Sequence, residues 1–301
     1  MGDVRIFDTD LARRLVLHEA RAQQTPAREL RDLGDGWLFH DPTDAEPFWN
    51  RLIAPVWPSE TAAFDHRLDE VITLFSTIGR LPHIRPLPIG GAPADLTRRL
   101  TVAGFETVGA DRRMVLARHG DGDALVAAMT ARVTRAFDGA AEVLVDRRES
   151  RRSPGQRGGP ASGNERWADR RRWAVDASLV LADAFDVDPV RRDVLENDLL
   201  ACVSRPGCAV LTVSVGGVPA AIARRATTTD GSYLSSIGTR PAFRNRGLGA
   251  LATALVVRDA LAAGSPMVHL AVDEGNERAL RLYERLGFTT VGEAAPDLLL
   301  R

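Results

Sequence analysis

The stretch SYLSSIGTRPAFRNRGLGALATALVVRDALAAG, residues 232–264, decides the fold of this chain. It begins as a β-strand ending at Thr239, and a helix is predicted from about Arg246 to Ala263, stopped by Gly264. Between them lies RNRGLGA, residues 244–250. Glycines allow a ligand to approach the backbone closely, and the first N–H groups of a helix lack internal partners. The pattern therefore predicts either a pyrophosphate-type anion site or, more simply, an ordinary turn.

The same glycines fit a second interpretation, the dinucleotide fingerprint G-x-G-x-x-[G/A]. Gly247, Gly249 and Ala252 satisfy it, and Asp273 follows at the distance expected of a ribose-binding acid. However, the fingerprint places its first glycine at the end of a strand, whereas Pro241 and its neighbours intervene here. The chain after Ala252 is also too short for the second half of such a fold. A dinucleotide-dependent oxidoreductase is therefore the third hypothesis for function.

A second motif, N-x-x-A-x-x-x-Y-x-x-x-G-F, runs from Asn276 to Phe288. In a helix that begins at Asn276, the side chains of Ala279 and Tyr283 share one face, because residues three and four apart are neighbours. The structural alternatives are simple, since Asn276 is a good N-cap and Tyr283 could be a core aromatic residue. Tyrosine is nevertheless rare in this chain, where it occurs twice.

The clearest boundary in the chain is residues 147–172, RRESRRSPGQRGGPASGNERWADRRR. This segment is rich in Arg, Gly, Pro and Ser and has no hydrophobic period, so we expect a flexible linker. Its arginines could instead form a basic arm for an acidic partner, but the interleaved aromatic residues of single-strand binders are missing. The linker would separate an N-terminal domain, residues 1–140, from a C-terminal domain, residues 173–301.

Hydrophobic periodicity and turn residues predict the remaining elements. The expected helices are residues 10–33, 47–53, 64–78, 94–103, 173–185, 189–203 and 276–286. The expected strands are residues 106–116, 208–215, 218–226, 232–239, 267–273, 288–292 and 297–300, with a short apolar segment at 83–87.

Part of the first half repeats part of the second. LTRRLTVAGFETVG, residues 96–109, aligns with ALRLYERLGFTTVG, residues 279–292. Helix, glycine stop and strand coincide in both, which is the trace expected of a duplication. In this alignment Leu100 stands opposite Tyr283 and Pro93 opposite Asn276, so the first copy keeps the scaffold without the polar groups.

These motifs, in this order, resemble the GNAT acetyltransferases, a family of acetyl-CoA-dependent N-acyltransferases. The specific motifs lie between Ile237 and Phe288, and the element order matches from about Trp173. With the repeat, the whole chain resembles a tandem GNAT, the arrangement of mycothiol synthases, with a degenerate N-terminal copy. The resemblance implies an α/β (α+β) fold of mixed sheets flanked by helices, with central strands at Thr239 and Ala271 that splay apart.

The resemblance also implies roles for individual residues. The backbone of Ile237, Gly238 and Thr239 would pair with the pantetheine arm of CoA, and Asn276 would contact that arm as well. Tyr283 would protonate the departing thiolate. The amides of Arg246 to Ala250 would hold the CoA pyrophosphate, with Arg244 opening the motif. The implied cofactor-binding residues of this loop are Arg244, Asn245, Arg246, Gly247, Leu248, Gly249 and Ala250.

The implied reaction is direct attack of a neutral amine, from a small molecule or a peptide, on the thioester, with a backbone N–H near Gly238 steadying the oxyanion. Many family members carry a Glu on the strand before the glycine loop to deprotonate the amine, but this strand has none. The base stays open among residues of the first half and Ser235, Ser236, Asp273, Glu274 and His269. A non-catalytic acyl-CoA sensor is therefore the main alternative.

Composition excludes several other classes of function. The chain has no lysine, which rules out a Walker-A loop, a kinase lysine and a pyridoxal-phosphate Schiff base. Two cysteines and six scattered histidines show no metal-binding spacing, so no metal is expected. A net charge of −1, no long apolar run and no leader-like N-terminus favour a cytoplasmic protein that binds neither nucleic acid nor membrane. Sequence does not indicate the oligomeric state.

Overall fold

A computed structural model describes residues 8–117, 121–137, 142–149 and 163–301. The chain divides into two compact units that do not follow chain order. The first unit contains residues 1–117 together with residues 269–301, and the second contains residues 118–268. The C-terminal segment therefore completes the N-terminal unit.

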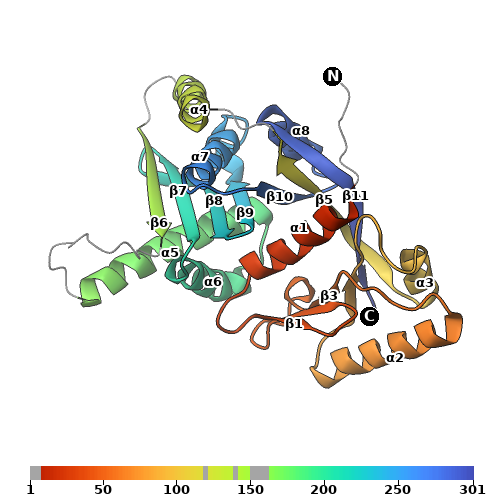
Figure 1. The fold of residues 1–301 in the computed structure, drawn as a ribbon. Coiled ribbons are helices and arrows are strands. Elements are labelled where there is room, and N and C mark those ends of the chain that lie inside the picture. The colour runs from red at the N-terminus through yellow and green to blue at the C-terminus, as the bar shows by residue number, and fades with distance from the viewer. Residues whose placement is uncertain (1–7, 118–120, 138–141, 150–162) are drawn as a thin grey trace. The chain divides into compact units, whose positions relative to one another are not determined.

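The first unit is a mixed sheet with helices on its faces (Figure 1). Its strands are ordered β1-β2-β3-β4-β11-β5-β10, and all pair antiparallel except β3 with β4. Its helices are α1 (Thr9–Ala22), α2 (Thr61–Thr77), α3 (Leu96–Val102), α8 (Glu277–Arg285) and the 3-10 turn η1 (Pro47–Trp49). Its strands are β1 (Glu29–Asp32), β2 (Trp37–His40), β3 (Arg51–Ile53), β4 (His83–Arg85), β5 (Glu106–Leu116), β10 (Val268–Asp273) and β11 (Phe288–Leu299).

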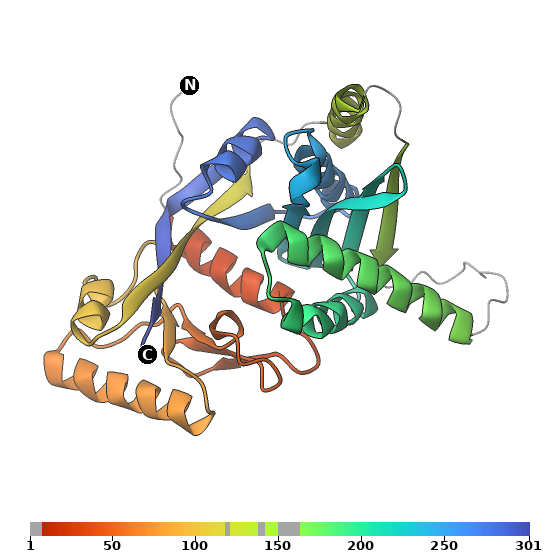
Figure 2. The same ribbon diagram turned by 180° about the vertical axis from the view of Figure 1, so that it is seen from behind.

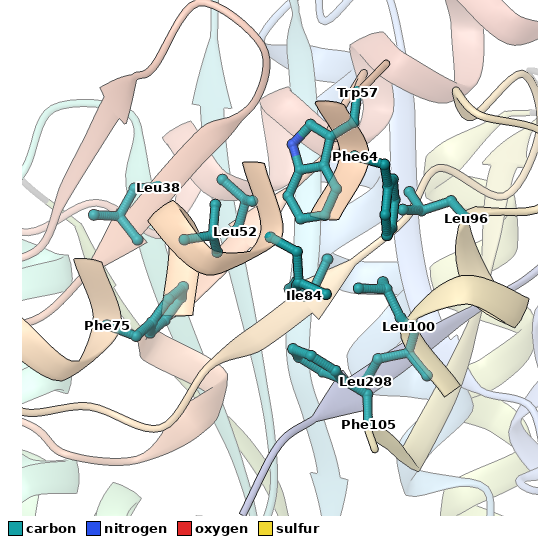
Figure 3. Packing of buried hydrophobic residues seen from close by; sticks show 12 residues of the cluster. Leu38, Leu52, Trp57, Phe64, Phe75, Ile84, Leu96, Leu100, Phe105 and Leu298 are labelled. Carbon is teal, nitrogen blue, oxygen red and sulfur yellow. The ribbon is translucent and has the colours of Figure 1, made fainter. Parts of the chain in front are cut away.

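Side chains of this sheet alternate between two faces, as the period of a β-strand requires. Leu38, Leu52 and Ile84 point into an apolar cluster with α2 and α3 (Figure 3). Their neighbours Phe39 and Ile53 instead join a second cluster with Val16 and Ala20 of α1. The first unit thus has an apolar core on each face of its sheet.

The second unit is an antiparallel sheet with strand order β9-β8-β7-β6. Helices α5 and α6 cover one face of this sheet, and α7 covers the other (Figure 1 and Figure 2). Its strands are β6 (Val143–Glu149), β7 (Cys208–Val215), β8 (Val218–Thr228) and β9 (Gly231–Thr239). Its helices are α4 (Gly122–Ala136), α5 (Gly163–Phe185), α6 (Arg192–Ser204), α7 (Leu248–Ala262) and the 3-10 turns η2 (Pro189–Arg191) and η3 (Pro241–Phe243).

Several sequence predictions are wrong in detail. The helix predicted over residues 10–33 ends at Ala22, and β1 follows after a turn containing Pro26, which no helix interior tolerates. The segment predicted as helix 47–53 is a 3-10 turn followed by β3. The last two predicted strands are one strand, β11, whose register shifts between Val291 and Ala295. Gly292 has φ +66° in this bulge, and sequence analysis took it for a strand end.

The predicted linker, residues 147–172, is structured at both ends. Residues 147–149 are the end of β6, and Arg147 pairs with Leu211 of β7. Residues 163–172 belong to α5, and residues 150–162 lie outside the described part of the chain. Pairing with a distant strand orders the arginine-rich end of β6, and no local pattern reveals such a partner. Sequence analysis also missed β2 and α4.

The compact units do not coincide with the two predicted copies. The division at residues 1–140 and 173–301, which was drawn at the linker, stays a prediction about domains, and the compact units cross it. Both aligned repeat segments lie in the first unit, where β5 and β11 pair antiparallel along most of their length. Because β11 pairs with β5, residues 269–301 belong to the same compact unit as the N-terminal residues.

Candidate functional site

The glycine loop lies at the N-terminus of α7 in the second unit. Gly247 is the N-cap with φ +87°, a left-handed conformation that favours glycine, and Asn245 has φ +68°. No side chain caps this helix. The first amide of α7 with a backbone partner is that of Leu251, which donates to the Gly247 carbonyl at 3.0 Å. The amides of Leu248, Gly249 and Ala250 therefore stay available for an external acceptor.

Helix α4 packs beside this loop. A Cβ placed on Gly247 would lie 3.4 Å from Cγ2 of Val133 and 3.6 Å from Cδ of Arg132. The Arg246 guanidinium stacks over the Phe137 ring with its Cζ 4.8 Å from the centroid. Sequence analysis did not predict α4. The available signal was Asp121, whose carboxylate caps the helix by accepting from the amides of Asp123 and Ala124.

The strand before the loop, β9, is bulged where the resemblance expects it to meet pantetheine. Ser236 has φ +52°, and the register with β8 shifts between Ile222 and Arg224. Gly238 follows the bulge, and a Cβ there would lie 2.7 Å from the Ala184 Cβ of α5. Glycine is thus required at position 238 by the close packing of α5, whatever else its backbone contacts.

Arg244 is the exposed residue that opens the glycine motif. Its guanidinium donates to two backbone carbonyls, that of Thr239 at 3.2 Å and that of Ala184 at 2.9 Å. These bonds tie the loop to the end of β9 and the end of α5. Arg244 therefore has a structural role here, and contact with a phosphate stays a prediction.

The second motif lies in the first unit on α8. Asn276 is the N-cap of this helix, with its Oδ1 accepting from the Ala279 amide at 3.1 Å. The predicted capping role of Asn276 is thus confirmed. Tyr283 is buried and meets Phe288 edge to face, with ring centroids 5.9 Å apart. Burial raises the pKa of Tyr283 above its ordinary value, so its hydroxyl stays protonated at neutral pH.

The candidate bases differ sharply in surroundings. His269 is buried in the first unit, where its Nε2 lies 2.6 Å from Nδ1 of His18. Burial, followed by the charge of His18, lowers the pKa of His269 well below its usual value. Glu274 is paired with Arg112, and Asp273 accepts from the Gly275 amide at 2.9 Å. His269 and Glu274 are thus engaged in contacts of their own.

The predicted site residues fall into two sets. Residues 237–250 belong to the second unit, whereas Asn276 and Tyr283 belong to the first. A single site formed by both sets stays a prediction, as does the splay of the strands at Thr239 and Ala271. In the described part of the chain, no three His, Cys, Asp or Glu side chains are grouped so as to hold a metal ion.

Two further observations concern the dinucleotide-dependent oxidoreductase and the membrane-spanning helices considered in the sequence analysis. The dinucleotide hypothesis is not supported, because that fold is built on a doubly wound parallel sheet and strands β6 to β9 of the second unit pair antiparallel. Among the described residues, no helix combines the length and apolar character needed to cross a membrane.

Comparison with known proteins agrees with the motifs. Residues 172–288 match the model of the acetyltransferase (GNAT) family. A mycothiol acetyltransferase of Nocardiopsis dassonvillei is 36% identical over 130 residues, which is 40% of this chain and 39% of that protein. The aligned part thus spans well under half of this relative's length.

Solved structures match over nearly the whole chain at low identity. A GCN5-related N-acetyltransferase from Kribbella flavida has a TM-score of 0.59 and 20% identity, covering 96% of this chain and 95% of its own. A tandem GNAT protein from the clavulanic acid biosynthesis pathway has a TM-score of 0.53 and 14% identity, covering 92% and 83%. These likenesses show a shared mixed α/β fold of the tandem-GNAT type. The family match covers residues 172–288, and these structures extend the likeness in fold to most of the chain.

Proposed function

We propose that this chain is an N-acetyltransferase that transfers the acetyl group of acetyl-CoA to an amine by direct attack in a ternary complex. One observation carries the proposal. The N-terminus of α7 begins at a left-handed glycine and has no side-chain cap, within the residues that match the family. A chain that needed only a stable helix would gain from a capping residue here. An uncapped start suits a ligand that brings its own oxygens, such as a pyrophosphate.

The second unit would hold the CoA portion of the substrate. The amides from Arg246 to Ala250 would donate to the pyrophosphate, with Arg244 and Asn245 shaping the loop. The backbone of Ile237, Gly238 and Thr239 would pair with the pantetheine arm as an added strand. The bulge at Ser236 supports this role, because a bulge bends a strand away from regular pairing with its neighbour.

The chemistry needs a hydrogen-bond donor at the carbonyl oxygen and an acid for the leaving thiol. The amine nitrogen would attack the thioester carbonyl carbon, and the C–S bond would then break. A backbone N–H near Gly238 would stabilise the negative charge on the oxygen. Tyr283 would give its proton to the thiolate. Burial raises the pKa of its hydroxyl, which keeps the acid protonated but makes it a weaker proton donor.

The acceptor amine is not specified by these residues. Because one relative is a mycothiol acetyltransferase, the acceptor of that reaction belongs in any panel of candidate amines. The test is release of free thiol from acetyl-CoA with such a panel. We expect turnover with at least one amine and none without amine.

A non-catalytic acyl-CoA sensor is the second candidate. The observation that favours it is that β9 carries no carboxylate and that two candidate bases are engaged, His269 with His18 and Glu274 with Arg112. Binding of acetyl-CoA without thiol release from any amine would make the sensor the better description.

A further inference from the structure

Helix α4 packs along α7 in the second unit, and its C-terminal end lies beside the glycine loop (Figure 1). At one end of this helix pair, a Cβ placed on Gly122 would lie 3.1 Å from Cα of Arg258. At the other end, Cγ2 of the fully buried Val133 lies 3.4 Å from the corresponding point on Gly247. The two contacts show that α4 runs antiparallel to α7 and fix which of its side chains face the loop.

Helix α4 lies outside the residues that match the family. The match covers residues 172–288, whereas α4 is Gly122–Ala136. Its packing nevertheless brings its side chains to the N-terminus of α7. A residue of α4 that contacts a ligand there would belong to no motif of the glycine loop, and only the tertiary structure reveals it.

Arg132 extends from α4 over the N-cap of α7. Its Cγ and Cδ both lie 3.6 Å from the position of a Cβ on Gly247. The guanidinium begins one bond beyond Cδ, so it can reach an acceptor that is bound to the amides of Leu248 and Gly249. At the end of α4, the Phe137 ring stacks on Arg246 and holds the loop against this helix.

Arg132 also differs from the arginine at the opposite end of the helix pair. It is exposed, and none of the residues that the structure describes forms a hydrogen bond or ion pair with its guanidinium. Arg258 instead donates from Nη2 to Asp259 Oδ1 at 3.2 Å. An exposed arginine is ordinary by itself, but this one lies over a helix start that no side chain caps. Donors of the backbone and of a guanidinium thus meet at one point.

The described segments that meet at this point are basic. Residues 129–136 of α4, MTARVTRA, contain two arginines and no acid, and residues 240–250, RPAFRNRGLGA, contain three arginines and no acid. The acids of α4, Asp121 and Asp123, lie at its other end. The positive end of the α7 dipole adds to this charge. The surroundings therefore suit a ligand with more than one negative charge, such as a pyrophosphate.

We propose that Arg132 is a further CoA-binding residue, whose guanidinium donates hydrogen bonds to the pyrophosphate held by the amides of α7. This inference rests on the proposed function, because it takes CoA to be the ligand of the glycine loop. The pyrophosphate is the expected partner, rather than the 3′-phosphate, because the stem of Arg132 lies over Gly247. A guanidinium presents parallel donors that match phosphate oxygens. Arg132 would thus raise the affinity for CoA and take no part in acyl transfer.

The experiment is calorimetric titration of the full chain with CoA and with dephospho-CoA, which lacks the 3′-phosphate. Arg132→Met removes the charge and keeps an apolar stem over Gly247. We expect it to weaken the binding of both compounds about tenfold, because a charge-assisted hydrogen bond is lost. Added salt should weaken binding less in this variant than in the parent. Arg132→Lys keeps the charge and should bind both compounds more tightly than Arg132→Met.

Arg258→Met serves as the control, because it makes the same exchange at the other end of the helix pair. Cγ of Arg258 lies 3.2 Å from the position of a Cβ on Gly122, so this side chain also packs against α4. The variant should bind both compounds as the parent does. Loss of the contact with Asp259 should lower its melting temperature slightly.

Three outcomes would overturn this proposal while leaving the proposed function intact. Arg132→Met could bind CoA as tightly as the parent, which would remove Arg132 from the site. It could weaken the binding of CoA alone and not of dephospho-CoA, which would assign Arg132 to the 3′-phosphate. Equal losses in Arg132→Met and Arg258→Met would indicate loosened packing of α4. A parent that binds neither compound would instead contradict the proposed function itself, and this inference with it.

Discussion

Helices α2 and α7 hold equivalent positions in two segments of the chain that have the same order of elements. Their N-termini differ, because α2 is capped by a side chain and α7 is not. Each follows a strand and leads through a second strand and a short helix into a third strand, as β3-α2-β4-α3-β5 and β9-α7-β10-α8-β11. The Glu60 carboxylate closes the N-terminus of α2, accepting from the amides of Ala62 at 2.9 Å and Ala63 at 2.7 Å. Gly247 leaves the N-terminus of α7 open. A carboxylate of the chain itself thus caps α2, whereas α7 begins without a side-chain cap.

The strands on either side of α2 pair with each other. In the first copy β3 and β4 are hydrogen-bonded in parallel, with Leu52 opposite Ile84. Backbone groups that pair with each other offer no edge to a pantetheine arm. Further along, Leu100 of α3 is fully buried in the apolar core (Figure 3), where the second copy has Tyr283. We therefore predict that the first copy does not bind CoA.

The largest expected effect comes from placing a side chain at the uncapped N-terminus of α7. Gly247→Val should abolish acetyl-CoA binding, because the added side chain blocks close approach to the amides. Calorimetric titration measures this directly. A valine at φ +87° also costs about 1–2 kcal/mol of stability.

The matched control is Gly34→Val. Gly34 also has φ +87°, and a Cβ there meets nothing within 4 Å. This variant should lose similar stability and keep full affinity. Equal affinity of Gly247→Val and the parent would contradict the anion-site interpretation.

The next effect concerns Tyr283, which the repeat aligns with Leu100. It distinguishes an enzyme from a non-catalytic sensor. Tyr283→Phe should lower kcat by about 10²–10⁴-fold with acetyl-CoA affinity nearly unchanged, since a general acid is lost while the ring stays. Steady-state kinetics and the melting temperature should be compared with those of Tyr233→Phe, which alters the other tyrosine. A fall in stability without a selective kinetic defect would mark the Tyr283 hydroxyl as structural.

The pH dependence of that reaction gives a second readout. Because burial raises the pKa of Tyr283, the acid stays protonated to a higher pH than an exposed tyrosine would. The fall of kcat on the alkaline side, followed in the parent, should therefore lie above pH ~10, the pKa of an unperturbed tyrosine. A fall attributable to Tyr283 below that pH would contradict this role.

A smaller effect tests whether the first copy binds CoA once its helix cap is removed. Acetyl-CoA should bind the parent with one equivalent per chain, and Glu60→Gly should still bind one, because β3 and β4 remain paired. Calorimetric stoichiometry measures this, and two equivalents in either protein would show that the first copy binds CoA. Removing the cap should lower the melting temperature slightly.

The smallest effect concerns stability in the first unit. The folded state holds His269 neutral with a lowered pKa, so the unfolded chain binds protons first as the pH falls. Stability from this group is complete above pH ~6.5 and is lost as the pH falls below it. Urea unfolding at pH 7.5 and 5.5 should show the loss, and His269→Phe should reduce the pH dependence. If the free energy of unfolding depends on pH equally in His269→Phe and in the parent, the effect belongs to other groups.

Local sequence was sufficient where an element depends on its own residues. Strands β5 and β7 have the predicted bounds, and both aligned repeat segments end their helices at glycines, Gly104 and Gly287, that share φ +94°. A left-handed helix end favours glycine in any context, so the sequence displays it. Asn276 likewise caps α8 through its neighbour three residues on.

The rest depended on partners far away in the chain. Sequence could not show that β6 orders itself on β7, that α4 packs beside Gly247, or that β11 completes the N-terminal unit. It also left His269 as a candidate base, and only folding placed it against His18. Motifs with short-range geometry indicated the family that residues 172–288 match and the uncapped start of α7. Burial and long-range pairing, which no window of sequence contains, decided which polar groups of this chain remain free to act.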